Sequence, residues 1–233
     1  MKSDRKSRHC IAIAALLAVC LAQSANAQKP ELSVAALSLP GESTGLVHWR
    51  SSNAVTQPLQ LSVRYFSERI ELESNVIEFF AEPLDPSTAI EPPEPFLRMR
   101  IPDGRDKVYL VITGHLDEEN NTLWRGNMLD GREWKAGSMK VFNAFESPLG
   151  IVADGKDPIR IDAGGSVDFH ARDHDRAGFA VRIYRLEPER RVVFSSKWRV
   201  AEDRRELLFI GNNQGRLTLR ALIDLGSQTA PPQ

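Results

Sequence analysis

The side chains with the clearest capacity for chemistry lie in the segment DFHARDHD, residues 168–175. Imidazole nitrogens and carboxylate oxygens are ligands for Zn²⁺, Cu²⁺, Ni²⁺ and Mn²⁺. A zinc site needs three or four such ligands at about 2.0–2.2 Å from the ion. Alternate residues of a strand share one face, so Asp168 and His170 would point together, and His174 would be a third ligand. One hypothesis is therefore a metal-handling protein that uses these three residues.

The same segment is also typical of a strand end followed by a solvated loop. A strand over residues 166–170 would end in the polar turn 173–178. The helical HExxH arrangement of zinc proteases is absent, because the segment has no Glu and predicts no helix. We therefore favour the polar turn, and the metal site stays as the alternative.

Two tryptophans have more than one interpretation. Trp124 and Trp134 flank a turn-rich stretch in an otherwise polar part of the chain. Aromatic rings of this kind either stack on sugars and anchor protein partners or fill the space between two modules. Both interpretations remain open for Trp124 and Trp134, whereas Trp198 ends an alternating strand and is expected to pack in a core.

The familiar catalytic motifs are missing from the sequence. It contains no G-x-S-x-G elbow, no G-x-G-x-x-G after a strand and no phosphate-binding loop. We therefore assign no catalytic residue and expect no cofactor. A hydrolase with an unrecognised pair of carboxylates remains an alternative, because any two acidic residues can meet in a fold.

The N-terminus predicts export. Basic residues precede a short apolar run over residues 10–22, and Ala25-Asn26-Ala27 is a small-x-small cleavage site. This is the architecture of a signal peptide, here residues 1–27, and the apolar run is too short for a permanent transmembrane helix. We expect a periplasmic or extracellular protein, with a lipoprotein anchored through Cys20 as an alternative. Cys10 and Cys20 are the two cysteines of the chain, so the mature protein would contain no disulfide.

Charge argues against nucleic acid as a partner. The formal net charge of the full chain is −1, and cleavage of the basic signal peptide would make the protein more acidic. The arginines between residues 182 and 205 alternate with acids, which predicts a mixed charged sheet face that resists aggregation. A surface for an anionic polysaccharide is the sharper alternative for these arginines.

The elements that would position these residues are strands. Helical periodicity is nearly absent, whereas short alternating or β-branched runs are separated by turn residues, as in all-β proteins. Pro102-Asp103-Gly104 predicts one such turn, because proline presets φ and glycine accepts a positive φ. We expect strands at residues 59–66, 96–101, 107–113, 138–143, 149–153, 158–162, 166–170, 179–186, 191–198, 206–210 and 216–222.

The spacing of these strands predicts two antiparallel immunoglobulin-like β-sandwich modules. We place the first at residues 28–116, a connecting segment at 117–135, the second at 136–225 and a flexible tail at 226–233. The hairpins at residues 101–112 and 161–171 resemble each other weakly, which suggests an internal repeat.

Two stretches also resemble a known family. They are VFNAFESPLGIVADGKDPIRIDAGGSVDF (residues 141–169) and RVVFSSKWRVAEDRRELLFI (residues 191–210). They are similar to a family of uncharacterised exported bacterial proteins of unknown function. The matching positions are Phe142, Asn143, Pro148, Leu149, Gly164, Ser195, Ser196, Trp198, Asp203, Arg204, Arg205, Leu207 and Phe209. The resemblance implies a secreted two-module β protein. It transfers no functional residue, and His170 and His174 lie outside the shared pattern.

Together these features predict a non-catalytic exported protein that binds or scaffolds at the cell envelope. Its partner would be an envelope protein or a polysaccharide.

Overall fold

The computed structural model describes residues 29–37, 45–52, 55–84, 93–116, 122–132, 134–145, 147–186, 190–213 and 216–225. The expected signal peptide and C-terminal tail lie outside these residues. The described chain is all-β, as the sequence predicted, and none of its helices is long and apolar enough to span a membrane.

The first half of the chain forms β1 (Glu31–Ala36), β2 (Leu46–Arg50), β3 (Gln57–Gln60), β4 (Ile70–Glu71), β5 (Val76–Phe80), β6 (Leu97–Arg100), β7 (Lys107–Leu116) and β8 (Thr122–Asp130). The second half forms β9 (Ser138–Asn143), β10 (Leu149–Ala153), β11 (Ile159–Ile161), β12 (Ser166–His170), the single 3₁₀ turn η2 (Ala171–Asp173), β13 (Phe179–Arg185), β14 (Arg191–Trp198), β15 (Arg205–Asn213) and β16 (Arg216–Asp224).

These strands form four sheets, two in each half of the chain. The first outer sheet has the order β3-β2-β5-β6 and the first inner sheet β4-β1-β7-β8. The second inner sheet has the order β12-β9-β15-β16 and the second outer sheet β11-β10-β13-β14. Neighbouring strands are antiparallel except for the parallel pairs β1/β7 and β9/β15. The two pairs of sheets are compatible with two β-sandwich modules, here called the first and second modules.

The second module repeats the strand order of the first. Adding eight to each strand number of the first module gives the order of both sheets of the second, including the parallel pair. The weak repeat expected from the sequence compared different elements. Residues 101–112 contain the turn after β6 and the first part of β7, whereas residues 161–171 run from the end of β11 through β12. The likeness is therefore one of topology, and the two hairpins that suggested it are not equivalent.

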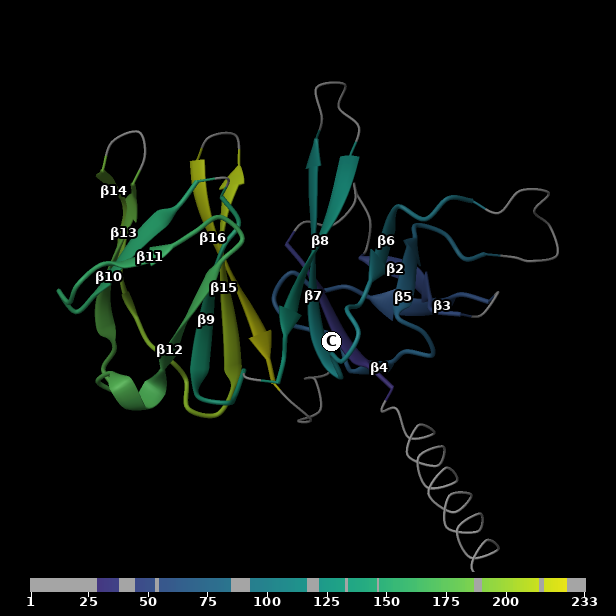
Figure 1. The fold of residues 1–233 in the computed structure, drawn as a ribbon, viewed down its shortest axis with the longest axis horizontal. Coiled ribbons are helices and arrows are strands. Elements are labelled where there is room, and N and C mark those ends of the chain that lie inside the picture. The colour runs from purple at the N-terminus through teal and green to yellow at the C-terminus, as the bar shows by residue number, and fades with distance from the viewer. Residues whose placement is uncertain are drawn as a thin grey trace, which may run out of the picture.

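The four sheets stack as layers, with an apolar core in each of the three spaces (Figure 1). One core lies between the two sheets of the first module and another between the two sheets of the second. A third core lies between the two inner sheets and so joins the modules. Its buried members are Ala35, Tyr109, Val111, Leu129, Trp134, Phe142, Leu207, Phe209 and Leu222.

Burial on both faces explains why β7 is so apolar. Val108, Leu110 and Ile112 point into the core of the first module, whereas Tyr109 and Val111 point into the inter-module core. A strand covered on both faces needs apolar residues at every position instead of every second one. The strand expected at residues 107–113 is confirmed as the first part of β7.

One expected strand is interrupted. The alternation over residues 59–66 continues in the sequence, but β3 ends at Gln60, and Val63 and Tyr65 are 39% and 37% exposed. The Ser62 hydroxyl accepts hydrogen bonds from the N–H groups of Arg64 and Tyr65, and this local turn competes with the strand. The prediction of one continuous strand is therefore wrong.

The chain after this turn crosses to the second module. The N–H of Ser67 donates to Val34 O of β1 (2.8 Å), whereas the N–H of Phe66 donates to Ile223 O of β16 (3.1 Å). Ile223 N–H donates in turn to Arg64 O (2.8 Å). Backbone hydrogen bonds therefore tie the two modules together beside the inter-module core.

The segment expected to connect the modules, residues 117–135, contains β8. This strand pairs with β7 along its whole length, and the chain passes between the modules over the shorter stretch 131–137. Arg132 holds the start of this stretch, since its side chain donates to both carboxylate oxygens of Asp130. Hydrogen bonding from Arg132 is the main cause that lowers the pKa of Asp130 to about 2.

Polar groups complete the contact between the modules. The Tyr109 hydroxyl donates to the Asp224 carboxylate of β16 (2.5 Å), which also accepts from Arg205 (2.9 Å). Arg205 donates through Nε to Trp134 O, and the Trp134 ring packs edge-on against the rings of Tyr109 and Phe66. Burial, followed by the hydrogen bond to Asp224, raises the pKa of Tyr109 far above its usual value.

This arrangement predicts a loss of stability at alkaline pH. A tyrosine with a raised pKa in the folded state contributes its full stabilisation below the unfolded pKa of 10.0 and loses it as the pH rises above that value. The free energy of unfolding should fall by up to about 1.4 kcal/mol per pH unit from Tyr109 alone. Urea unfolding between pH 9 and 11 measures this slope, and Tyr109→Phe should make it shallower. Equal slopes in both proteins would contradict the role of Tyr109.

Candidate functional site

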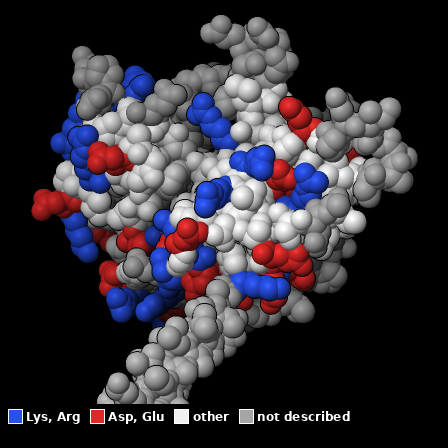
Figure 2. Space-filling view, turned by 45° about the vertical axis from the view of Figure 1, so that its right-hand side comes forward, with Lys and Arg blue, Asp and Glu red and all other residues white. Residues whose placement is uncertain are grey.

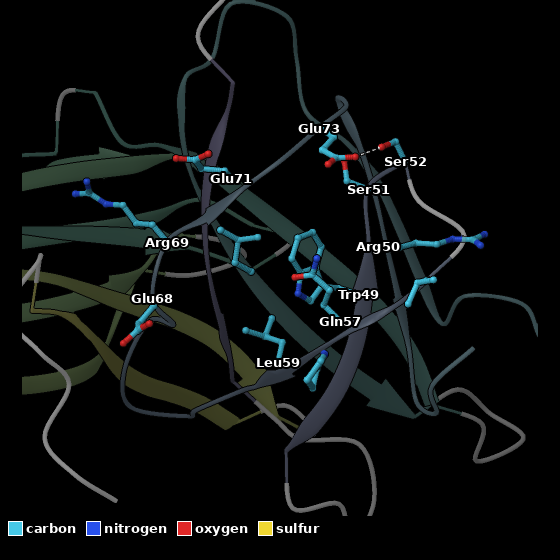
Figure 3. Close-up of a pocket in the computed structure, with 13 residues that line it drawn as sticks. Trp49, Arg50, Ser51, Ser52, Gln57, Leu59, Glu68, Arg69, Glu71 and Glu73 are labelled. Atoms are coloured by element: carbon cyan, nitrogen blue, oxygen red, sulfur yellow. Dashed lines mark hydrogen bonds between the residues drawn. The ribbon is translucent and has the colours of Figure 1, made fainter. Parts of the chain in front are cut away.

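The candidate site is a groove of about 380 Å³ on the open side of the first module (Figure 3). It lies between the ends of β2 and β3 in the first outer sheet and β4 in the first inner sheet. Its lining residues are Trp49, Arg50, Ser51, Ser52, Val55, Gln57, Pro58, Leu59, Glu68, Arg69, Ile70, Glu71 and Glu73.

The floor of the groove is apolar. Trp49 is on the core-facing side of β2 and is only 7% exposed. Leu59 and Ile70 are partly buried against the same core from the two walls. Because so little of the Trp49 ring is accessible, it cannot offer a full face to a sugar, and the floor instead suits small apolar side chains.

The closed end of the groove is held by two serines. Ser51 follows β2 and Ser74 follows β4, and their hydroxyls lie 3.1 Å apart. The Ser51 hydroxyl also accepts from the Ser74 N–H (2.9 Å), and the Ser74 hydroxyl donates to Ser51 O (3.1 Å). Beside them, Ser52 donates to the Glu73 carboxylate (2.6 Å). These bonds tie the end of β2 to the loop that connects β4 of the inner sheet to β5 of the outer sheet.

The walls carry a surplus of negative charge. Arg50 points away from the groove (Figure 3) and forms an ion pair with Glu78 (2.6 Å). Arg69 forms an ion pair with Glu31 (3.4 Å). Glu68 and Glu71 are exposed, and no basic residue of the described chain forms an ion pair with either. A ligand with positive charge would therefore meet two unpaired carboxylates.

The two strands that flank the groove differ in the backbone that they expose. Leu61 N–H donates to Gly45 O, so the backbone N–H and C=O groups of the odd-numbered residues of β3 face β2. The backbone of Pro58 therefore faces the free edge of β3, where proline has no N–H to donate. Leu72 N–H donates to Pro30 O, so the backbone groups of Glu71 face away from β1. The free edge for a further strand is therefore that of β4.

The corresponding corner of the second module contains the DFHARDHD segment. Glu31 and Ser138 each begin the parallel ladder of their module. Glu71 pairs with Glu31 and His170 pairs with Ser138, so Glu71 and His170 occupy equivalent positions. The chain then forms the η2 turn and brings His174 against Phe179, with ring centroids 3.8 Å apart.

His174 fastens this corner in the way that Ser74 fastens the first. Its Nδ1 lies 3.4 Å from the carboxylate of Asp154, the residue after β10, and its side chain is 7% exposed. Asp154 also accepts from the N–H of Ala180 (3.0 Å). The second module thus places a histidine ring where the first module has serines beside an open groove.

The three expected metal ligands do not converge, because Asp168 and His170 share one face of β12 whereas His174 packs against Phe179. Asp168 is exposed and accepts from Lys140 (2.8 Å), while His174 packs between the two sheets. His170 alternates with the buried Phe169, so it lies on the opposite face of β12. Within the described ranges no group of three His, Cys, Asp or Glu side chains could hold a metal ion. The metal-handling hypothesis therefore finds no geometric support.

The two tryptophans of the turn-rich stretch lie in different environments. Trp134 is 1% exposed in the inter-module core and presents no surface to a ligand. Trp124 on β8 is half-buried at the rim of the first core, 5.4 Å from the Phe96 ring. It lies over Gly114, since a Cβ at that glycine would be 2.8 Å from the indole ring.

Several positions behind the family resemblance have structural contacts. Asn143 is fully buried, and its amide donates to the carbonyl oxygens of Ser147 and Ile161 (both 3.0 Å). It therefore fixes the turns after β9 and β11. Arg205 donates to its cross-strand partner Asp224, the carboxylate that accepts from Tyr109 of the first module.

Comparison of the chain with family models and with curated proteins found no match. The site therefore rests on geometry alone. Sequence reasoning missed Glu68, Glu71 and the floor of the groove, because β2 and β4 are short and give little periodicity. The sequence feature that indicates this groove is the run of charged residues within 68–73, which follows the alternating stretch at residues 59–66.

The geometry predicts different roles for the two histidines. His174→Ala should lower the free energy of unfolding by about 1–3 kcal/mol, because it removes a buried ring stacked on Phe179. The matched His170→Ala change, on the partly exposed opposite face, should stay within about 0.5 kcal/mol of the parent protein. Urea unfolding at pH 7 measures both. Equal effects of the two substitutions would contradict the assignment, and loss of a stoichiometric metal ion in both variants would revive the metal site.

Proposed function

We propose that the protein is a non-catalytic, exported binding or scaffolding protein of the cell envelope, and that its groove holds an extended segment of a partner protein. The observation that carries this proposal is the combination of an apolar floor, two unpaired carboxylates and the free edge of β4 on one open side of a sandwich. Export is proposed from the composition of residues 1–27, which lie outside the described chain.

An extended peptide suits the groove for two reasons. Strand addition satisfies the backbone groups that an edge leaves exposed, and alternate side chains of the added strand point to one side. Those side chains would meet the floor formed by Leu59 and Ile70, while basic residues of the peptide would meet Glu68 and Glu71. The short length of β4 limits the paired region, so the side-chain contacts would supply the specificity.

The small exposed area of Trp49 disfavours a neutral sugar in this groove. Sugar recognition usually uses the open face of an aromatic ring, and the Trp49 ring is largely covered by the first core. An envelope protein is therefore the partner that we assign to this site. The proposed immunoglobulin-like type of the modules is supported by the packing of two four-stranded, antiparallel-rich sheets in each.

Model peptides test this proposal. An alternating Lys-Val peptide should bind the purified protein and change Trp fluorescence, whereas an alternating Glu-Val peptide should not. Glu68→Lys together with Glu71→Lys should weaken binding by roughly tenfold or more, because two charge pairs become repulsive. Isothermal titration calorimetry at 0.05 M and 0.15 M NaCl measures the affinities.

Glu94→Lys is the control, since Glu94 is an exposed carboxylate of the first module outside the groove. It should leave the affinity unchanged. Equal binding of the basic and acidic peptides, or an equal effect of the control and groove substitutions, would refute the peptide groove.

A further inference from the structure

The outward face of the second outer sheet carries a separate cluster of cations. Phe179, Val181 and Ile183 of β13 are buried in the core, so the alternate residues Arg182 and Tyr184 point away from it. Arg182 is exposed and Tyr184 is partly exposed. This face is the end of the four-layer stack, and no further sheet covers it among the described residues.

Two more basic residues join them from the neighbouring strand. The Arg190 guanidinium lies over the Tyr184 ring at 4.8 Å from its centroid. Lys197 of β14 is exposed and pairs with Ala180, one pleat from Arg182 on the same face. We call Arg182, Tyr184, Arg190 and Lys197 the basic face.

The equivalent face of the first module differs, because its arginines have an acidic partner. There Glu78 of β5 lies between Arg50 of β2 and Arg98 of β6, at 2.6 Å and 3.2 Å from their Nε atoms. Figure 2 shows Lys and Arg side chains interspersed with Asp and Glu over the first module. At this end of the stack, cations of two neighbouring strands thus share one carboxylate between them.

The basic face lacks such a partner. In the second outer sheet Arg182 of β13, the counterpart of β5, lies between Val152 and Ser195. No Asp or Glu of the described residues forms an ion pair with Arg182, Arg190 or Lys197. Among the described residues, the basic face thus holds three cations without an ion pair, together with the Tyr184 ring and with Val192, which is 51% exposed.

We propose that the basic face binds an anionic polysaccharide, with Arg182, Arg190 and Lys197 contacting its carboxylate or sulfate groups. Guanidinium groups form paired hydrogen bonds to such anions, and the ring of Tyr184 offers an apolar surface to a sugar. This site lies in the other module from the groove and does not depend on the peptide proposal. A protein with both sites would link an envelope protein to a polysaccharide.

Binding to defined polymers tests the basic face. The purified full chain is titrated with dextran sulfate, polyguluronate and neutral dextran, and both anionic polymers should bind while neutral dextran should not. Arg182→Glu should lower the affinity roughly tenfold at 0.15 M NaCl and reduce its dependence on salt. Arg100→Glu makes the same charge change on the exposed face of the first outer sheet and should have little effect.

Two more variants distinguish binding at the basic face from a general effect of charge. Tyr184→Ala should weaken binding of the polymers, and Glu68→Lys with Glu71→Lys should leave it intact. Equal losses from Arg182→Glu and Arg100→Glu would show an effect of net charge alone and would overturn the proposal. So would tighter binding of a DNA oligonucleotide than of either polymer, or no anionic polymer binding at 0.15 M NaCl.

Discussion

The burial of both inner sheets on both faces is the constraint on which the structure depends. Each inner sheet closes the core of its own module on one face and contributes to the inter-module core on the other. Opening the modules would expose Trp134 and would break the hydrogen bond between Tyr109 and Asp224. Because burial of apolar surface is the main favourable term in folding, the two modules must fold as a joined pair.

Differences between two modules of equal strand order locate the candidate site. In the second module, His174 fills the corner after β12 by stacking on Phe179, and Asp154 holds it from β10. In the first module, Ser51 and Ser74 fasten the same corner with small side chains, which leaves a groove beside them. The two corners thus differ in the side chains that occupy them, and the groove lies beside the one with the smaller side chains.

The two ends of the stack differ in charge for a reason that can be read from cross-strand pairs. Facing residues on neighbouring strands lie close together, so one acid in a central strand can form ion pairs with bases on both sides. Glu78 does so for Arg50 and Arg98, whereas Arg182 has Val152 and Ser195 as neighbours. Strand pairing is therefore needed to tell which cations of the arginine-rich stretch at residues 182–205 form ion pairs and which do not.

The sequence by itself determined the all-β class and the strands of the second module. Four of these eight strands have the predicted bounds, at residues 138–143, 149–153, 166–170 and 191–198. It also determined the turn at Gly104, whose φ is +76°. Tertiary structure decided that β8 belongs to the first module and that residues 61–67 leave their strand to contact β16. It also decided that Asp168, His170 and His174 do not converge. The physical reason is that alternation reports which side of a strand is apolar, whereas the identity of the covering layer depends on pairing between residues far apart in the chain.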